Sequence, residues 1–345
     1  MRKLLVIFAV VSIVSGVGAY ASGQASTLRS TGFDSNLRGL SVRSVGSFDL
    51  WASGTNGIVL RSFDEGKSWK KLEVKGGADL DFRDIDALDA NTAYLMSTGE
   101  GEKSRIYKTS DGGKSWALQF TDKRPGFFLD SIACALKNRC FALSDPVEGK
   151  FLIVATRDGE HWEDLPRDKM PAALPGESAF AASGTSIKVC QNNIYFGTGG
   201  PSARIFRSAD SGRSWTAVET PMASGNSSSG IFSVACRGRY VVAVGGDYKE
   251  PDRASKVAIY SKDFGASWNL AAQQPQGYRS GVVFLSDKDI VAVGPNGIDL
   301  SFDTGAHWTR SDILNLNSVR HVGDQAWAVG PKGTFVHLAP HLRWP

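Results

Sequence analysis

An eight-residue motif recurs six times along this chain and constrains its fold more than any other feature. Five copies read Ser/Thr-x-Asp-x-Gly-x-x-Trp, and the third copy lacks one residue before its Trp. The copies are SFDEGKSW (62–69), TSDGGKSW (109–116), TRDGEHW (156–162), SADSGRSW (208–215), SKDFGASW (261–268) and SFDTGAHW (301–308). Their Asp residues are separated by 47, 47, 52, 53 and 40 positions. Self-similarity at such a period indicates an array of one supersecondary unit.

The motif is the Asp-box, or BNR repeat, and we interpret each copy as a turn between two strands. The Asp carboxylate can accept hydrogen bonds from the N–H groups of the next two residues, and the Gly supplies a left-handed conformation. The Trp then begins the next strand and covers the turn with an apolar ring. We therefore expect a structural role, and not a catalytic one, for the six box aspartates, which are Asp64, Asp111, Asp158, Asp210, Asp263 and Asp303.

A second signature, an apolar run that ends in a Gly-rich turn, occurs seven times, which is once more than the box. The seventh repeat lacks both a box and a fourth strand, and residues 26–33, ahead of the first repeat, can supply that strand. Radial repetition of this kind is typical of propellers. The sequence thus predicts an all-β fold, a seven-bladed β-propeller of four-stranded antiparallel blades over residues 26–339, with Asp-box turns between third and fourth strands and a C-terminal tail at 340–345.

The first residues have the pattern of a secretory signal peptide. Arg2 and Lys3 precede an apolar stretch, and Ala19-Tyr20-Ala21 forms a small-x-small cleavage site. We expect residues 1–21 to be removed and the mature chain to be exported, either periplasmic or secreted. A retained signal anchor is the alternative.

Charge and cysteine content limit the partners and cofactors. Without residues 1–21 the chain has 37 basic and 35 acidic residues, and this near-balance argues against nucleic acid as a partner. The four cysteines, Cys134, Cys140, Cys190 and Cys236, can form disulfides in an oxidising compartment or remain buried thiols. No Cys/His spacing fits zinc, and we expect neither a metal nor a cofactor.

Polar residues gather in the segments that the predicted propeller would bring together on one face. These segments are the turns between second and third strands and the linkers entering first strands, and we call this face, opposite the boxes, the upper face. The candidate binding residues are Arg38, Arg83, Asp84, Asp130, Glu177, Arg279, Glu102, Lys103, Asp145, Asp247 and Tyr248. Their guanidinium groups can bind acidic or carbonyl groups of a peptide. Alternatively, the charges pair across blades, Arg83 with Asp130 for example, and fill the channel.

Several of these segments, including FALSDPVEGKF, LPGESAFAASGTSI and YFGTGGPSARIFRSADSGRSW, resemble the bacterial relatives of the plant photosystem II stability/assembly factor. The likeness covers about residues 35–338. It implies a seven-bladed Asp-box propeller. Photosynthetic members of that family act on the lumen side as chaperones for a reaction-centre subunit, through an arginine-rich patch whose best counterparts here are Arg38, Arg83 and Arg279. Because many relatives occur in organisms without photosynthesis, the photosystem partner is not carried over.

The sequence therefore favours an exported, monomeric, non-catalytic propeller that binds a protein or peptide and assists an envelope or membrane complex. The alternative is a glycan-active hydrolase, because sialidases and some glucanases share the box. Such an enzyme needs two opposed carboxylates with aromatic platforms beside them. Phe127, Phe128, Tyr248 and Tyr278 could supply the aromatic rings. A third possibility is a structural module of a larger assembly.

Overall fold

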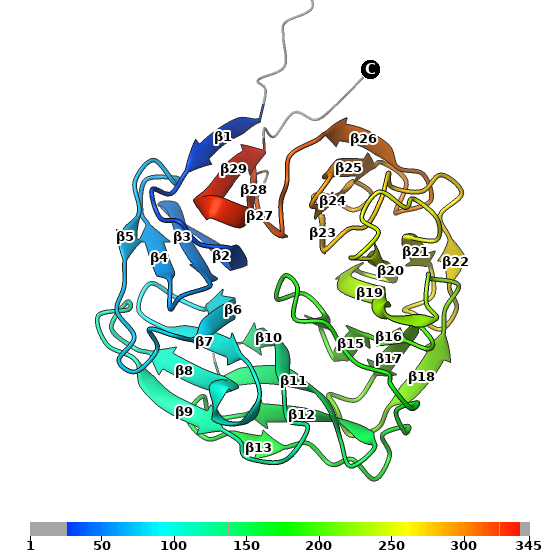
Figure 1. The fold of residues 1–345 in the computed structure, drawn as a ribbon, viewed down its shortest axis with the longest axis horizontal. Helices are drawn as coiled ribbons and strands as arrows, with labels where there is room; N and C mark the ends of the chain where they lie inside the picture. The colour runs from blue at the N-terminus through cyan, green and yellow to red at the C-terminus, as the bar shows by residue number, and fades with distance from the viewer. Residues whose placement is uncertain (1–25, 137, 324, 339–345) are drawn as a thin grey trace, which may run out of the picture.

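Seven antiparallel sheets stand around a central axis as the blades of a propeller (Figure 1). The structure is a computed structural model and describes residues 26–136, 138–323 and 325–338. The expected signal peptide and the tail at 340–345 lie outside the described residues. The all-β seven-bladed fold predicted from the sequence is confirmed.

Each blade begins with its innermost strand and ends with a strand at the rim. Blade 1 consists of β2 (Leu37–Val45), β3 (Ser47–Gly54), β4 (Val59–Ser62) and β5 (Lys70–Lys71). Blade 2 consists of β6 (Asp81–Ala87), β7 (Ala93–Thr98), β8 (Arg105–Thr109) and β9 (Ala117–Thr121), with a 3-10 turn, η1 (Gly101–Lys103), between β7 and β8. Blade 3 consists of β10 (Leu129–Leu136), β11 (Arg139–Val147), β12 (Lys150–Thr156) and β13 (Glu163–Asp164).

The following blades repeat this order. Blade 4 consists of β14 (Ile187–Cys190), β15 (Asn193–Gly197), β17 (Arg204–Ser208) and β18 (Thr216–Glu219). Blade 5 consists of β19 (Asn226–Arg237), β20 (Tyr240–Asp247), β21 (Ala258–Ser261) and β22 (Asn269–Leu270), and the short β16 (Gly199–Gly200) pairs with β19. Blade 6 consists of β23 (Gly281–Phe284), β24 (Ile290–Gly294), β25 (Gly297–Ser301) and β26 (Thr309–Asp312).

Blade 7 combines the two ends of the described chain. It consists of β27 (Ser318–Val322), β28 (Gln325–Val329), β29 (Thr334–Leu338) and β1 (Thr27–Ser30), with η2 (Pro331–Gly333) before β29. Strand β1 pairs antiparallel with β29, with Thr27 opposite His337 and Ser30 opposite Thr334. The prediction that the N-terminal segment supplies the missing fourth strand is confirmed.

Seven hydrophobic clusters hold neighbouring blades together, one at each interface. Trp51 and Trp327, which occupy equivalent second-strand positions, are fully buried in two of them. Because apolar burial contributes about 25 cal/mol per Å², these inter-blade clusters stabilise the ring at every interface.

The Asp-box turns join third and fourth strands, as expected, but their hydrogen bonds differ from the prediction. In the first box, Asp64 Oδ1 accepts the N–H of Ser68 at 2.9 Å and Asp64 Oδ2 accepts the Ser68 hydroxyl at 2.7 Å. The bonded amide is thus four residues on, because Glu65 and Gly66 both have positive φ and curl the chain back towards the carboxylate. Ser62 Oγ donates to Asp64 and accepts the Gly66 N–H. The expectation of bonds to the next two residues was wrong.

These bonds stabilise the ionised carboxylate. The hydroxyl and amide of the serine four positions on lower the pKa to about 2 at four boxes, those of Asp64, Asp111, Asp210 and Asp263. In the shortened third box, Asp158 accepts instead from the amides of Glu160 and His161.

Two disulfides settle the alternative left open for the cysteines. Cys134 and Cys140 face each other across the β10–β11 hairpin and are joined within blade 3. Cys190 in β14 is joined to Cys236 in β19, so this bond connects blade 4 to blade 5.

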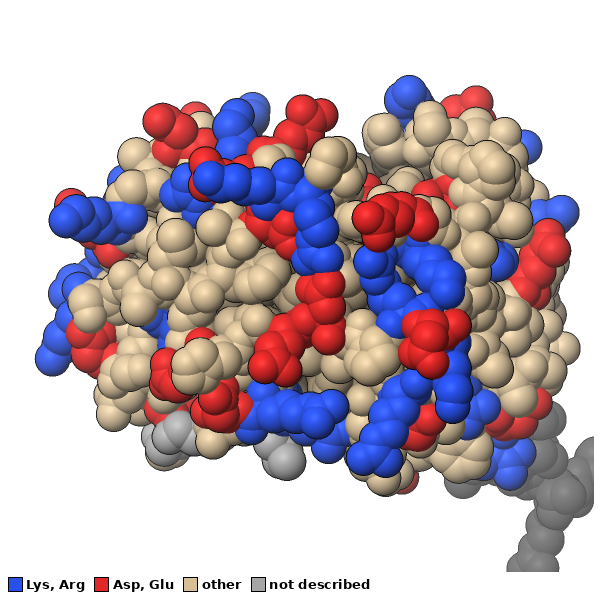
Figure 2. Space-filling model, turned by 90° about the horizontal axis from the view of Figure 1, so that it is seen from below, with Lys and Arg blue, Asp and Glu red and all other residues tan. Residues whose placement is uncertain are grey.

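The outer surface has mixed charge. Figure 2, which views the edge of the ring, shows Lys and Arg interspersed with Asp and Glu and no stripe of one sign on this side. In the part of the chain that the structure describes, no helix is long and apolar enough to cross a membrane.

Candidate functional site

A segment between β13 and β14, residues 179–186, reaches into the centre of the ring (Figure 1, green). We call it the central segment. Arg83 Nη1 donates to the carbonyl oxygen of Ala181 at 2.8 Å, and Arg38 Nη1 donates to that of Ala182 at 3.0 Å. Two arginines of blades 1 and 2 therefore anchor a segment that enters blade 4.

Contacts from blades 6 and 7 fix the same segment from the other side of the channel. Ser183 Oγ donates to the Ser280 carbonyl at 2.6 Å, and Ser318 Oγ donates to the Ser183 carbonyl at 2.9 Å. Asp145 of blade 3 and Ser233 of blade 5 also bond to it, so the central segment is bonded to all six other blades. It divides the channel into an upper and a lower part.

The upper part is a cavity of about 510 Å³, which we call the upper cavity. Its walls combine charged groups with aromatic rings, and its lining includes Arg38, Arg83, Asp130, Phe128, Phe180, Phe232, Tyr248 and Tyr278. Phe180 stacks on Phe232 with ring centroids 3.8 Å apart, and Tyr278 contacts Phe232 edge-on at 4.7 Å. Tyr248, 47 % exposed, forms the rim. A concave apolar site with a few polar groups is the usual form of a ligand pocket.

The same local irregularity brings four of these side chains to the upper cavity. The pairing of each innermost strand with its neighbour shifts register by one residue at Arg38 in β2, Arg83 in β6, Asp130 in β10 and Phe232 in β19. A β-bulge leaves the extra residue unpaired in the ladder and re-aims its side chain. Equivalent bulges thus build the site from four blades.

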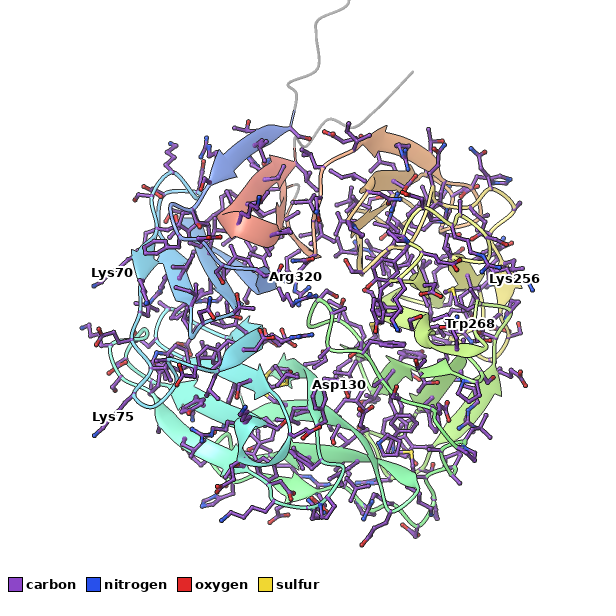
Figure 3. The ribbon with its side chains drawn as sticks, viewed as in Figure 1. Lys70, Lys75, Asp130, Lys256, Trp268 and Arg320 are labelled. Atoms are coloured by element: carbon purple, nitrogen blue, oxygen red, sulfur yellow. A yellow bond between two sulfur atoms is a disulfide. The ribbon has the colours of Figure 1, made fainter. Side chains whose placement is uncertain are left out.

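Asp130 is the most unusual group in the upper cavity. Asp130 is 1 % exposed, and within the part of the chain that the structure describes neither carboxylate oxygen has a hydrogen-bond partner. Burial raises the pKa of Asp130 well above its usual value, the neighbouring Asp145 charge raises it further, and Arg83 opposes both effects. Figure 3 shows Asp130 and Arg320 at the inner margin of the ring, whereas Lys70 and Lys75 project from its rim.

Asp145, near the end of β11, is the neighbouring carboxyl group that raises the pKa of Asp130. Its Oδ1 accepts the N–H of Ala179, which begins the central segment, at 2.8 Å. Burial raises the pKa of Asp145 to about 6. Two neighbouring carboxyl groups with raised pKa values therefore lie beside one end of the upper cavity.

Arg83 does not pair with Asp130, in contrast to the cross-blade example considered from the sequence. Within the described residues it pairs with Asp81, from Nε to Oδ2 at 2.7 Å, and its Nη1 is bonded to the central segment. The charge of Arg83 is therefore balanced on its own strand.

Two other candidate residues are committed to ion pairs inside the protein. Arg279 is fully buried and pairs with the equally buried Asp299, and it also donates to Asn296. Glu177 is 4 % exposed, pairs with Arg204 and accepts the Thr198 hydroxyl. Neither side chain is presented to a partner.

Asp84 lies in the lower part of the channel and not on the upper face. It accepts the N–H of Ile132 at 2.8 Å, and Arg320 is 3.7 Å away. Burial raises the pKa of Asp84 to about 7, although Arg320 opposes the shift. Gly184 packs directly on it: a Cβ there would lie 2.1 Å from Asp84 Oδ1, and the φ of Gly184 is +67°. Asp84 thus closes the underside of the central segment.

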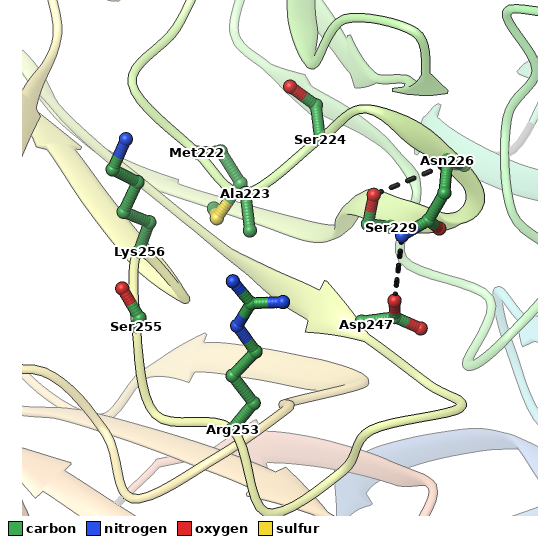
Figure 4. Close-up of a pocket in the computed structure, with 9 residues that line it drawn as sticks. All are labelled: Met222, Ala223, Ser224, Asn226, Ser229, Asp247, Arg253, Ser255 and Lys256. Atoms are coloured by element: carbon green, nitrogen blue, oxygen red, sulfur yellow. Dashed lines mark hydrogen bonds between the residues drawn. The ribbon is translucent and has the colours of Figure 1, made fainter.

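The remaining candidates lie on the upper face but outside the upper cavity. Glu102 and Lys103 are exposed on η1, where Glu102 pairs with Lys123 at 3.3 Å. Asp247 lines a separate cavity of about 210 Å³, where Asn226 Nδ2 donates to it at 2.9 Å and Arg253 extends alongside (Figure 4). Of the predicted residues, the upper cavity brings together Arg38, Arg83, Asp130 and Tyr248, with Asp145 behind them.

Phe180, Phe232 and Arg320 were missed as channel residues by the sequence analysis. Phe180 lies in LPGESAFAASGTSI, one of the segments that carry the resemblance, but the candidate residues were chosen mainly for their charge. No group of three metal-ligating side chains close enough to hold a metal ion is present among the residues that the structure describes.

The fold and its channel define a seven-bladed Asp-box propeller with a segment-filled centre and a bulge-built cavity on the face opposite the boxes. Residues 27–170 match the model of the family described as photosynthesis system II assembly factor YCF48. The resemblance drawn from the sequence is confirmed over this part of the chain, which is similar to the Ycf48 family.

One curated relative is the photosystem II assembly lipoprotein Ycf48 of Synechococcus sp. (strain CC9902), which is 33 % identical over 89 residues. The match covers 26 % of this chain, and it spans only about a quarter (25 %) of the relative's length.

Two solved structures have the same fold. One is YCF48 bound to D1 peptide, with a TM-score of 0.66 and 13 % identity over 92 % of this chain and 97 % of that one. The other is the GH74 enzyme of Niastella koreensis, with a TM-score of 0.63 and 16 % identity over 92 % of this chain and 54 % of the enzyme. At such identities the likeness concerns the fold alone.

Proposed function

We propose that this chain is an exported, non-catalytic propeller that acts as a monomer and binds a protein or peptide partner in the upper cavity. By this contact it would assist the assembly or stability of an envelope or membrane complex. The observation that carries the proposal is the upper cavity itself: bulges in four blades aim polar and aromatic side chains into one concave site.

Similar proteins support this function. The family that residues 27–170 match is described as an assembly factor, and one structure of the same fold was solved with a peptide bound. Export is supported by the description of the curated relative as a lipoprotein. It is also supported by the two disulfides, since such bonds persist mainly in oxidising compartments.

The test is capture of a partner from the envelope fraction of the source organism, with identification by mass spectrometry. Tyr248→Ala removes an exposed ring at the rim of the upper cavity. Phe264→Ala is the matched control, because Phe264 is similarly exposed, at 42 %, in a box turn on the opposite face. We expect Tyr248→Ala to lose most of the captured partner and Phe264→Ala to keep it. Equal capture by both variants would contradict the proposal.

A glycan hydrolase is the second candidate, favoured by one observation. Asp130 and Asp145 are neighbouring carboxyl groups with raised pKa values beside an aromatic cavity, and glycosidases use such a pair as acid and nucleophile or base. This function requires that the wild-type chain release sugar from a panel of glycans and that Asp130→Asn and Asp145→Asn stop the release. Absence of release by the wild-type chain would eliminate it.

A further inference from the structure

The upper cavity contains hydrogen-bond acceptors that the protein itself leaves unused. Asp130 is held on its bulge at the start of β10, and both of its oxygens are buried without a partner among the described residues. Buried polar groups in folded proteins are nearly always bonded, and leaving one unbonded is destabilising. A carboxylate kept in this state next to a cavity is suited to a ligand that donates hydrogen bonds.

The charges around Asp130 indicate whether that ligand is a cation or an anion. The titratable and charged groups facing this end of the cavity come from β2, β6, β11 and the loops after β20 and before β23, and they are Arg38, Asp81, Arg83, Asp145, Tyr248 and Tyr278. Arg83 is balanced by Asp81. Arg38 is directed to the carbonyl of Ala182, burial lowers its pKa, and its Nε has no hydrogen-bond partner among the described residues. Asp130 and Asp145 therefore form a carboxyl pair that no ion pair neutralises within the described residues.

The aromatic walls favour the same kind of ligand. Phe128, Phe180, Phe232 and Tyr248 line the cavity together with Asp130. The face of an aromatic ring attracts cations, and the attraction increases when the cation is desolvated. A carboxylate surrounded by rings is a recurrent way to hold an alkylammonium group, because the rings contact its methylene chain while the oxygens bind its N–H groups.

We propose that the Asp130 end of the upper cavity is a subsite for a primary ammonium group, carried by a lysine side chain of the bound peptide. This inference rests on the proposed function and specifies the chemistry of its ligand. The ammonium donates to the free oxygens of Asp130, and Asp145 adds negative charge while its Oδ1 remains bonded to Ala179.

Binding at this subsite is linked to a proton. Burial and Asp145 raise the pKa of Asp130, so a proton on Asp130 competes with the ammonium, whose complex needs the carboxylate. The proton leaves to the buffer when the cation enters. Affinity for the cation must therefore increase with pH, which is opposite to the trend for a ligand carboxylate that needs the neutral acid as donor.

The experiment is isothermal titration calorimetry of the mature chain with a capped glycine pentapeptide that contains one central lysine. The same peptide with Nε-acetyl-lysine is the neutral control. We expect the lysine peptide to bind at least about tenfold more tightly, a difference of about 1.4 kcal/mol. Its affinity should increase with pH, with proton release detected in buffers of different ionisation enthalpy.

Three variants test the residues. Asp130→Asn keeps the shape of the side chain and should abolish the preference for lysine without lowering the melting temperature. Asp145→Asn keeps an acceptor for Ala179 but removes the neighbouring charge, so it should shift the pH dependence to lower pH. Glu102→Gln, an exposed acid on the same face, should bind as wild type.

Any one of three results would overturn the inference. They are equal binding of the two peptides, no binding of the lysine peptide at millimolar concentration, and an unaltered preference for lysine in Asp130→Asn. The capture experiment separates this result from failure of the proposed function. If Tyr248→Ala still loses the partner, only the ammonium subsite is excluded; if it does not, the upper cavity is not the binding site.

Discussion

Arg83 holds the carbonyl oxygen of Ala181 at 2.8 Å, although the two residues are 98 positions apart in the chain. Since Asp81 balances the charge of Arg83, the guanidinium acts as a rigid two-sided donor between β6 and the central segment. The floor of the upper cavity thus depends on an arginine of a different blade.

Replacement of Arg83 by lysine should loosen the central segment. An ammonium group can keep one of the two contacts but not both, because it lacks the planar arrangement of donors. We expect faster amide hydrogen exchange in residues 179–186, measured by mass spectrometry, with little change in the rest of the ring. Arg253→Lys is the control, since Arg253 is exposed and pairs with Glu250 at 3.2 Å, away from the central segment. Unchanged exchange in the segment would show that Arg83 does not anchor it.

The buried pair of Arg279 and Asp299 should contribute to stability through mutual neutralisation. Arg279→Met leaves Asp299 fully buried without its partner, and breaking such a pair costs about 3–5 kcal/mol. The double variant Arg279→Met/Asp299→Leu removes both charges and should recover most of the loss. Urea denaturation gives the free energies of unfolding of the wild-type protein, the single variant and the double variant. A double variant as unstable as the single one would mean that the pair contributes more than neutralisation.

Stability should pass through a maximum near about pH 4, the ordinary pKa of an Asp carboxyl. The folded-state pKa is raised to about 7 for Asp84 and about 6 for Asp145, so their contribution is full below about pH 4 and is lost as pH rises through those values. Four box aspartates, those at 64, 111, 210 and 263, have folded-state pKa values of about 2, so their contribution is lost as pH falls from about 4 to about 2.

Asn substitution can separate the two limbs of this profile. Asp84→Asn should flatten the decline above about pH 4 and leave the acid limb unchanged, because the boxes are untouched. Denaturant unfolding at a series of pH values gives the profile. An unaltered slope above about pH 4 in this variant would be inconsistent with a neutral Asp84 in the folded protein.

The two disulfides should differ in their contribution. Cys190–Cys236 closes a loop with a sequence separation of 46, and Cys134–Cys140 one with a separation of 6. Loop entropy then predicts losses of about 4 and about 2 kcal/mol when each pair is replaced by Ala. Thermal unfolding of the two double variants tests the order. A larger loss for the short hairpin loop would exclude loop entropy as the main cause.

The fold could be predicted because the box is a local signal repeated in register. A Ser/Thr, an Asp, a Gly and a Trp each have one role in the same turn, and the missing fourth strand of the last repeat pointed to residues 26–33. The position of the hydrogen-bonded amide could not be predicted, because it depends on two consecutive residues with positive φ, one of them Glu65.

The site could be predicted only in part, for a reason that lies in the strands. The sequence placed Arg83 and Asp84 together, but the bulge in β6 directs Arg83 to the upper cavity and leaves Asp84 in the lower channel. A bulge has no residue signature of its own here, since Arg38, Arg83, Asp130 and Phe232 differ in type. Likewise, the ion pair of Arg279 joins the loop before β23 to Asp299 in β25, and this proximity is not readable from the chain.

The pairing of β1 with β29 has a consequence for how the molecule is made. Six blades consist of strands that leave the ribosome in succession, but the seventh needs the earliest strand and the last one. Strand β1 therefore has no partner strand until β29 has been synthesised. The ring can close only after residue 338 has emerged. A protease that removes either end opens the molecule at the same seam.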